Sequence, residues 1–94
     1  MNNPNTATKR ILVGLTLTAE PGKRIFVAGS FNRWRPDDIP MNAIDNHGLY
    51  LATMTVEQGL HQYKFIVDGQ WQPDPNNPLR TPDGMGGANS VLHV

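Results

Sequence analysis

Cysteine is absent from this 94-residue sequence, and so is any excess of charge of one sign. Without cysteine the chain has no disulfide framework, no thiolate nucleophile and no thiolate metal site. Eight Lys and Arg residues balance eight Asp and Glu residues, so no net charge attracts nucleic acid or an anionic membrane. No run approaches the roughly 20 apolar residues of a membrane-spanning helix, and residues 1–10 lack the apolar segment of a signal peptide. We expect a soluble, intracellular (cytoplasmic) domain without a cofactor.

The length suffices for one small domain with a single core. Nine glycines and eight prolines predict many turns and few helices. Alternation of apolar and polar residues predicts strands at 9–18, 24–28, 49–56, 60–67 and 89–94. Short strands separated by turns predict an all-β, antiparallel sandwich over residues 9–94. Residues 1–8 are expected to be a disordered tail, and segments 29–40 and 73–88 irregular loops.

The segment 60–74, LHQYKFIVDGQWQPD, predicts a β-hairpin. Asp68-Gly69 suits a type I′ turn, because both residues tolerate the positive φ that this turn requires. Such a turn places Ile66 opposite Trp71, and side chains of directly opposed residues share a face. The hairpin then has a core face and an open face: Tyr63, Phe65 and Val67 point to the core, whereas Lys64, Ile66 and Trp71 point away from it. Phe26 and Phe31 are also expected in the core.

Four motifs in this order resemble one known family: GSFNRW at 29–34, GLHQYKFIVDGQW at 59–71, Asp74-Pro75, and NSV at 89–91. The family is carbohydrate-binding module family 48, which includes the glycogen-binding domain of the AMP-activated protein kinase beta subunit. The resemblance extends from about Arg10 to Val94. It implies an immunoglobulin-like β-sandwich that binds α-1,4-linked glucans.

The resemblance also implies which residues hold the sugar. Two tryptophans, a lysine and an asparagine grip it, and an apolar loop residue inserts into the curl of the glucan. Gly87 occupies the position at which the kinase subunit has a threonine that contributes to sugar binding. The contact from that hydroxyl is therefore missing. By position, the implied carbohydrate-binding residues are Trp34, Lys64, Trp71, Met85 and Asn89.

The chemistry of these residue types fits a sugar polymer. A pyranose ring has an apolar C–H face that stacks on indole, which offers a large flat surface at little entropic cost. Its hydroxyl rim accepts a hydrogen bond from Lys64, and Asn89 can both donate and accept. A neutral polymer needs no net protein charge. The expected partners are glycogen, starch, maltooligosaccharides and cyclodextrin, together with a glucan-processing enzyme or a kinase subunit, and neither nucleic acid nor membrane.

Each site residue also has an ordinary structural interpretation. Trp34 and Trp71 could be core residues, Lys64 a solvated strand lysine, Asn89 a turn residue, and Met85 a loop tip packed on the core. As an alternative, the sequence leaves open a structural or regulatory protein-interaction domain of the same fold that binds no sugar. A single-stranded nucleic-acid-binding domain is a third class, because basic residues gather in the first third of the chain: Lys9, Arg10, Lys23, Arg24, Arg33 and Arg35.

An enzyme is not expected. A glycosidase needs two carboxylates facing each other across a cleft, whereas the acidic residues here fall mostly in predicted turns. The three histidines do not have the spacing of metal ligands. Because the sequence ends with the last predicted strand and begins with a linker-like segment, it could be either a whole protein or a module of a longer one.

Overall fold

The structure, a computed structural model, describes residues 9–94, and within that range it contains eight β-strands and no helix. The predicted tail, residues 1–8, lies outside the described part of the chain. No helix among the described residues is long and apolar enough to span a membrane. The strands are β1 (Arg10–Thr18), β2 (Ile25–Gly29), β3 (Ile39–Ala43), β4 (Leu49–Glu57), β5 (Leu60–Val67), β6 (Gln70–Gln72), β7 (Arg80–Pro82) and β8 (Ala88–His93).

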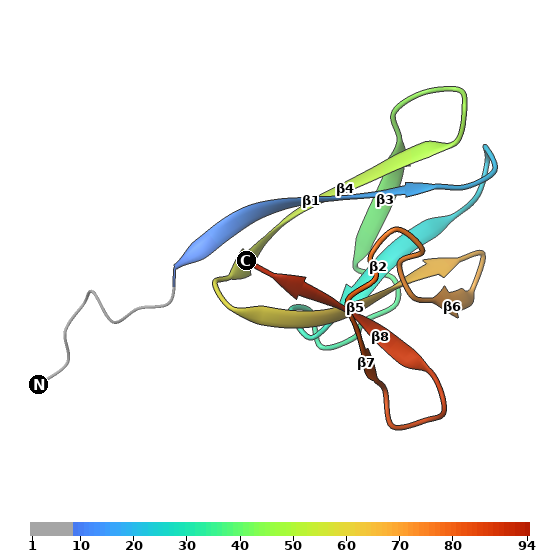
Figure 1. Ribbon diagram of the computed structural model, residues 1–94. Coiled ribbons are helices and arrows are strands. Elements are labelled where there is room, and N and C mark those ends of the chain that lie inside the picture. The colour runs from blue at the N-terminus through green and yellow to red at the C-terminus, as the bar shows by residue number, and fades with distance from the viewer. Residues whose placement is uncertain (1–8) are drawn as a thin grey trace, which may run out of the picture.

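The strands form two layers that face each other, as Figure 1 shows. The first layer contains β1, β4 and the end of β3, and the second contains the start of β3 with β2, β5, β6, β8 and β7. β3 pairs with β2 through Met41 and with β4 through Asn42, so it passes from one layer to the other. All the pairings are antiparallel. The predicted all-β, β-sandwich class is confirmed.

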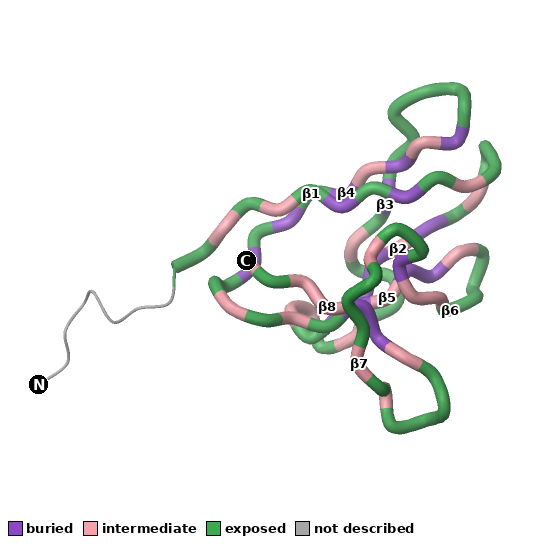
Figure 2. Tube along the Cα trace, viewed as in Figure 1, coloured by how far each residue is buried: buried purple, intermediate pink, exposed green. Residues whose placement is uncertain are grey.

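The core lies between the two layers, and the alternation of the strands explains which residues enter it. Inward side chains are buried while their neighbours are exposed, which gives the alternating colours along β1 and β4 in Figure 2. In β5, Tyr63 and Phe65 are fully buried and their rings meet edge to face at 5.7 Å between centroids. Aromatic pairs prefer this geometry. The core residues are Leu15, Leu17, Ile25, Val27, Met41, Tyr50, Ala52, Met54, Val56, Tyr63 and Phe65.

Two strands were not predicted. β3 contains Pro40 in the sequence IPMNA, and proline removes a ladder donor and argues against a strand. β7 is three residues long and ends at Pro82. Both owe their strand character to pairing with another strand, of β3 with β2 and of β7 with β8, which a local pattern of alternation does not contain.

The predicted hairpin is confirmed, but its open face is more apolar than expected. Val67 pairs with Gln70 and Ile66 with Trp71. Ile66 points away from the core and is nevertheless only 5% exposed, because Phe26 pairs with it from β2 and Trp71 from β6. The prediction that Phe26 belongs to the core is therefore wrong. Phe26 is half-buried on the outer face, and the guanidinium of Arg24 lies 5.6 Å from the centroid of its ring.

The segment that follows the hairpin was predicted as a long loop, and buried hydrogen bonds fix its first part. The Tyr63 hydroxyl donates to the Asp74 carboxylate (2.7 Å) and accepts from the Asn77 amide (3.2 Å). The Asp74 backbone N–H donates to the Ser90 hydroxyl (2.7 Å). Burial and the neighbouring Asp74 raise the pKa of Tyr63, so the phenol remains a donor. This network anchors the chain that leads into β7.

Candidate functional site

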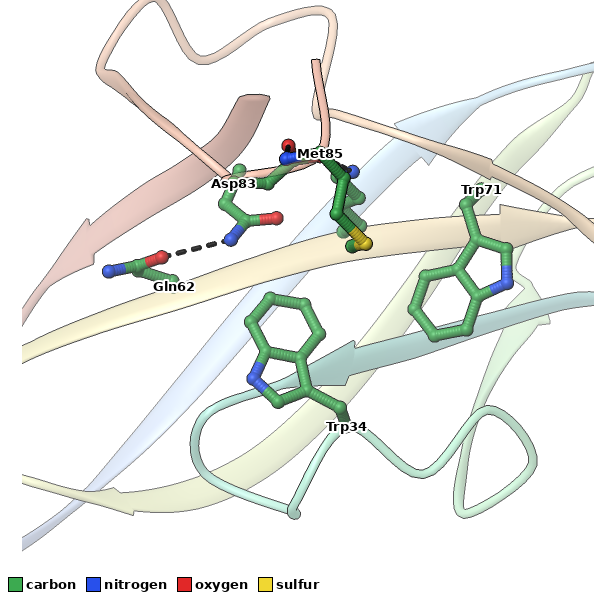
Figure 3. A pocket seen from close by; sticks show the side chains of 7 residues that line it. Trp34, Gln62, Trp71, Asp83 and Met85 are labelled. Carbon is green, nitrogen blue, oxygen red and sulfur yellow. Dashed lines mark hydrogen bonds and ion pairs between the residues drawn. The ribbon is translucent and has the colours of Figure 1, made fainter. Parts of the chain in front are cut away.

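A pocket of about 500 Å³ opens on the outer face of the second layer. All five residues that the family resemblance implies for carbohydrate binding line it, although they come from a loop after β2, from β5, from β6, from the β7–β8 loop and from β8. Figure 3 shows the indoles of Trp34 and Trp71 on its floor, with the Met85 side chain reaching toward the space between them. The lining residues are Trp34, Gln62, Lys64, Trp71, Asp83, Met85 and Asn89.

Trp71 is presented by the β5–β6 hairpin and is 46% exposed. The turn has positive φ at Asp68 (48°) and at Gly69 (82°), as a type I′ turn requires. The Asp68 carboxylate accepts a hydrogen bond from the backbone N–H of Arg24 (2.9 Å) and pairs with Lys23 (3.1 Å). These two contacts lower the pKa of Asp68. They tie the turn to the start of β2, so the indole stands on a fixed strand. Its exposure contradicts a core role.

Trp34 is half-buried in an irregular loop whose backbone is held in an unusual conformation. Arg33 and Trp34 both have φ of 59°, in the left-handed region that costs a non-glycine residue about 1–3 kcal/mol. The Trp34 N–H donates to the Gly29 carbonyl (3.0 Å). Such strain often accompanies functional loops, where the surroundings impose it.

Asn32 closes the Trp34 loop. The Asn32 side-chain oxygen accepts from the backbone N–H of Gly29 (2.9 Å), and its amide donates to the Arg35 carbonyl (3.3 Å). The side chain therefore spans the loop from one end to the other. It lies outside the set that lines the pocket.

Replacing Asn32 with alanine is expected to weaken ligand binding indirectly, because it loosens the loop that carries Trp34. The Gly29 N–H would lose its acceptor, which should cost about 1 kcal/mol of unfolding free energy. A mobile Trp34 should lower affinity by roughly fivefold, the equivalent of about 1 kcal/mol. A thermal melt and a glucan titration measure the two effects. Asn32→Asp keeps the acceptor for Gly29 and should retain most of the affinity, whereas equal losses in both variants would contradict this role.

Lys64 forms an ion pair that the sequence did not reveal. Its Nζ lies 2.8 Å from Asp83 Oδ2, and the two side chains are only 14% and 6% exposed. The interpretation of Lys64 as a solvated strand lysine is therefore wrong. An ammonium carries three donor hydrogens, so the pair leaves Lys64 able to donate into the pocket. The pKa of Asp83 is lowered to about 2, and the hydrogen bond from Lys64 is the largest cause.

The same Asp83 carboxylate shapes the loop that carries Met85. Its other oxygen, Oδ1, accepts from the backbone N–H groups of Met85 (2.7 Å) and Gly87 (3.0 Å). The Asp83 N–H donates to the Gly87 carbonyl (3.1 Å). Met85 stands at the tip with positive-φ glycines on both sides and is 85% exposed. It does not pack on the core. Asp83 thus positions both the apolar tip above the pocket and the ammonium inside it.

Asn89 lies in β8 and is 8% exposed, so it is a strand residue and not a turn residue. Its Nδ2 donates to Oε1 of Gln62 (2.9 Å), the bond drawn as a dashed line in Figure 3. This bond fixes the orientation of the Asn89 amide and leaves its carbonyl oxygen as an acceptor for a ligand in the pocket.

Sequence reasoning missed Asp83 and Gln62. A signal for Gln62 was present, because it is two residues from Lys64 in an alternating strand and must share its face. A signal for Asp83 was weaker: Asp followed by three glycines within four residues indicates a turn, but the pairing with Lys64 depends on the fold. The basic residues of the first third of the chain do not line the pocket. Lys23, for example, pairs with Asp68 and Glu20.

Comparison with known proteins gives one consistent result. The family model described as the glycogen recognition site of AMP-activated protein kinase matches residues 16–94. The 5′-AMP-activated protein kinase subunit beta-2 of Mus musculus is 43% identical over 76 residues, which are 81% of this chain and 27% of that protein. Subunit beta-1 of Sus scrofa is 38% identical over 73 residues, which are 78% of this chain and 56% of that protein.

The matched region is thus about a quarter of the mouse beta-2 subunit, 27% of its length. The residues that the family model matches, 16–94, include every strand from β2 to β8 and all the residues that line the pocket. Since the family model covers most of the sequence, the chain belongs to the family of glycogen recognition sites of AMP-activated protein kinase.

Proposed function

We propose that this chain binds α-1,4-linked glucan without catalysis, in the pocket between Trp34, Trp71 and Met85. The observation that carries the proposal is the convergence of two indoles, an ammonium, an oriented amide and the apolar tip at Met85 on one pocket from five separate segments. Indole faces suit the C–H face of a pyranose ring. Lys64 and Asn89 supply the donors and the acceptor for its hydroxyl rim.

The pocket offers little for hydrolysis. Asp83 is the one carboxylate among the residues that line it, and it is occupied by Lys64 and two backbone N–H groups. A glycosidase needs a second carboxyl group about 5–9.5 Å away and one of the two protonated. A pKa lowered to about 2 keeps Asp83 ionised. These features support a binding role for the site.

As part of the same proposal, the domain brings an associated activity to a glucan surface. The relatives it resembles are named as subunits of a protein kinase, so a kinase complex is the first partner to test, and a glucan-processing enzyme the second. Glycogen is the first glucan to test, because the family is described by glycogen recognition. Starch, maltooligosaccharides and cyclodextrin share the same linkage.

The first test is co-sedimentation with glycogen. The domain should pellet with the polymer and should be displaced by soluble maltoheptaose, while no reducing sugar appears above the buffer blank. Bovine serum albumin is the control for trapping. Failure to pellet with both glycogen and starch would overturn the proposal, and release of sugar by the purified domain would overturn its non-catalytic part.

Salt dependence separates glucan binding from binding to nucleic acid. Stacking and neutral hydrogen bonds release few counterions, so glucan affinity should change less than about twofold between low and moderate salt. Binding to a single strand would weaken with a log–log slope of about −0.7 per neutralised phosphate. Tight, salt-sensitive binding of an oligonucleotide without glucan binding would favour the nucleic-acid class.

A further inference from the structure

A second pocket, of about 320 Å³, lies on the same face of the second layer. It is lined by Ser30, Leu60, His61, Gln62, Thr81 and Val91. Gln62 also lines the first pocket, so the two hollows meet at one side chain. In β5, Ile66 stands opposite Trp71, and Gln62 is four residues along the strand, about 13 Å at the rise of a β-strand. The second pocket therefore continues the first along β5, away from Trp71.

The Gln62 side chain is fixed between the two pockets in one orientation. Its Oε1 accepts from Asn89, which leaves the two hydrogens of Nε2 as donors. Figure 3 shows that this nitrogen points away from Trp34 and Trp71. The Asn89–Gln62 pair thus leaves the Asn89 carbonyl oxygen as an acceptor and offers the Gln62 donors on the side away from the indoles.

The rest of the second pocket combines apolar surface with neutral hydrogen-bonding groups. Leu60 is 70% exposed, and it gives the pocket an apolar surface together with Val91, which pairs with Gln62. The Ser30 hydroxyl accepts from the Gln62 backbone N–H (3.0 Å), so its own hydrogen can be donated. Thr81 adds a second hydroxyl from β7. Apolar surface with hydroxyl, amide and imidazole groups, and without Asp, Glu, Lys or Arg among the lining residues, suits a neutral polyol.

We propose that the second pocket is an additional subsite for the same glucan chain, which leaves the two indoles, passes the Asn89–Gln62 pair and continues over Leu60 and Thr81. This inference rests on the proposed function of the first pocket. It assigns Leu60 and Thr81 a role that neither residue has in the first pocket. The domain then recognises a longer stretch of chain than the two tryptophans can cover, and prefers long linear segments to short ones.

The test is a series of linear maltooligosaccharides, from maltotriose to maltodecaose, titrated into the parent domain and into the double variant Leu60→Ala/Thr81→Val. Both changes are mild, because Leu60 is exposed and valine keeps the shape and branching of threonine. Leu12→Ala is the matched control, since Leu12 is 72% exposed on β1 of the other layer. Trp34→Ala reports on the first pocket.

In the parent, affinity should rise with chain length beyond the point at which the double variant reaches its plateau. The double variant should bind maltotriose as the parent does, but the longest chains roughly threefold to tenfold more weakly, about 0.7–1.4 kcal/mol. Leu12→Ala should match the parent throughout, and Trp34→Ala should lose affinity at every length. Identical length profiles for parent and double variant would overturn the second subsite alone. A parent that binds no oligosaccharide would overturn the proposed function, and the subsite with it.

Discussion

Trp71→Ala is expected to remove most of the glucan affinity and to leave a domain that still unfolds cooperatively. The indole is 46% exposed on the outer face, so its loss should cost less than the roughly 3–5 kcal/mol of a fully buried Trp→Ala change. Some cost remains, because Trp71 helps to cover Ile66. As a stacking platform the indole should contribute about 2 kcal/mol or more to binding, which is roughly a 30-fold change in Kd. A thermal melt and a glucan titration measure the two quantities.

The opposite result is expected for Tyr63→Ala. Tyr63 is 1% exposed, packs on Phe65 and bonds to Asp74, so its truncation should damage folding before binding. The two variants together separate the faces of the hairpin. If Trp71→Ala unfolds the domain, or binds glucan as tightly as the parent, the assignment of Trp71 to a binding face is wrong.

Asp83→Asn is expected to reduce glucan affinity by roughly tenfold or more, the equivalent of about 1.4 kcal/mol. The carboxylate serves Lys64 with one oxygen and the backbone of the Met85 loop with the other. A carboxamide has one acceptor oxygen and a donor nitrogen. Its oxygen can accept from either the Lys64 ammonium or the two backbone N–H groups of the loop. Its nitrogen then faces the remaining donors, with which it forms no hydrogen bond. The substitution should therefore displace Lys64 or the Met85 loop.

Asp45→Asn provides a matched control for Asp83→Asn. Asp45 Oδ1 accepts from the backbone N–H groups of His47 (2.8 Å) and Leu49 (3.0 Å), the same spacing in sequence that Asp83 uses. It lies in the turn between β3 and β4 and does not line the pocket. The control should melt slightly earlier and bind glucan as the parent does. Equal affinity of Asp83→Asn and the parent would contradict the positioning role of Asp83.

Acid should reproduce the effect of Asp83→Asn only near pH 2. The pKa of Asp83 is lowered from 3.8 to about 2 by the hydrogen bond from Lys64 and by the N–H groups of the loop. A lowered pKa means that the ionised form favours the folded site. The stabilisation of the folded site by the ionised Asp83 carboxylate is complete above about pH 4 and is lost as the pH falls toward 2. Glucan affinity measured between pH 7 and pH 3 should therefore be nearly constant with respect to this group. A loss of affinity near pH 5 would contradict the assignment.

The parts of the fold that local chemistry specifies were predictable from sequence. The Asp68-Gly69 turn sets the register of the hairpin, and alternation in β1, β4 and β5 assigns their core faces. The failures depend on tertiary contacts. Pro40 and Pro82 obscured β3 and β7, which are strands because they pair with β2 and with β8. Phe26 looked like a core residue, because the hairpin register places Ile66 opposite Trp71 but no local pattern reveals that Phe26 extends this apolar row.

The candidate site also has parts that could be predicted from the sequence and parts that depend on tertiary contacts. Trp34, Trp71 and Asn89 could be assigned to one binding surface from the family resemblance, and in the structure they line one pocket. Their support could not be foreseen. Asn32 spans its loop backward to Gly29, and Asp83 meets Lys64 across 19 positions of sequence. Such contacts depend on the closure of loops between strands, which spacing alone does not encode.

The most direct test of the central claim is tryptophan fluorescence during a titration with maltoheptaose. The chain has two tryptophans, so Trp34→Phe and Trp71→Phe each leave one indole, while phenylalanine retains part of the stacking surface. If the glucan lies across both rings, the remaining indole in each variant should change its emission and saturate at the Kd measured independently by calorimetry. A saturated complex in which either indole keeps the emission of the free protein would contradict a shared pocket.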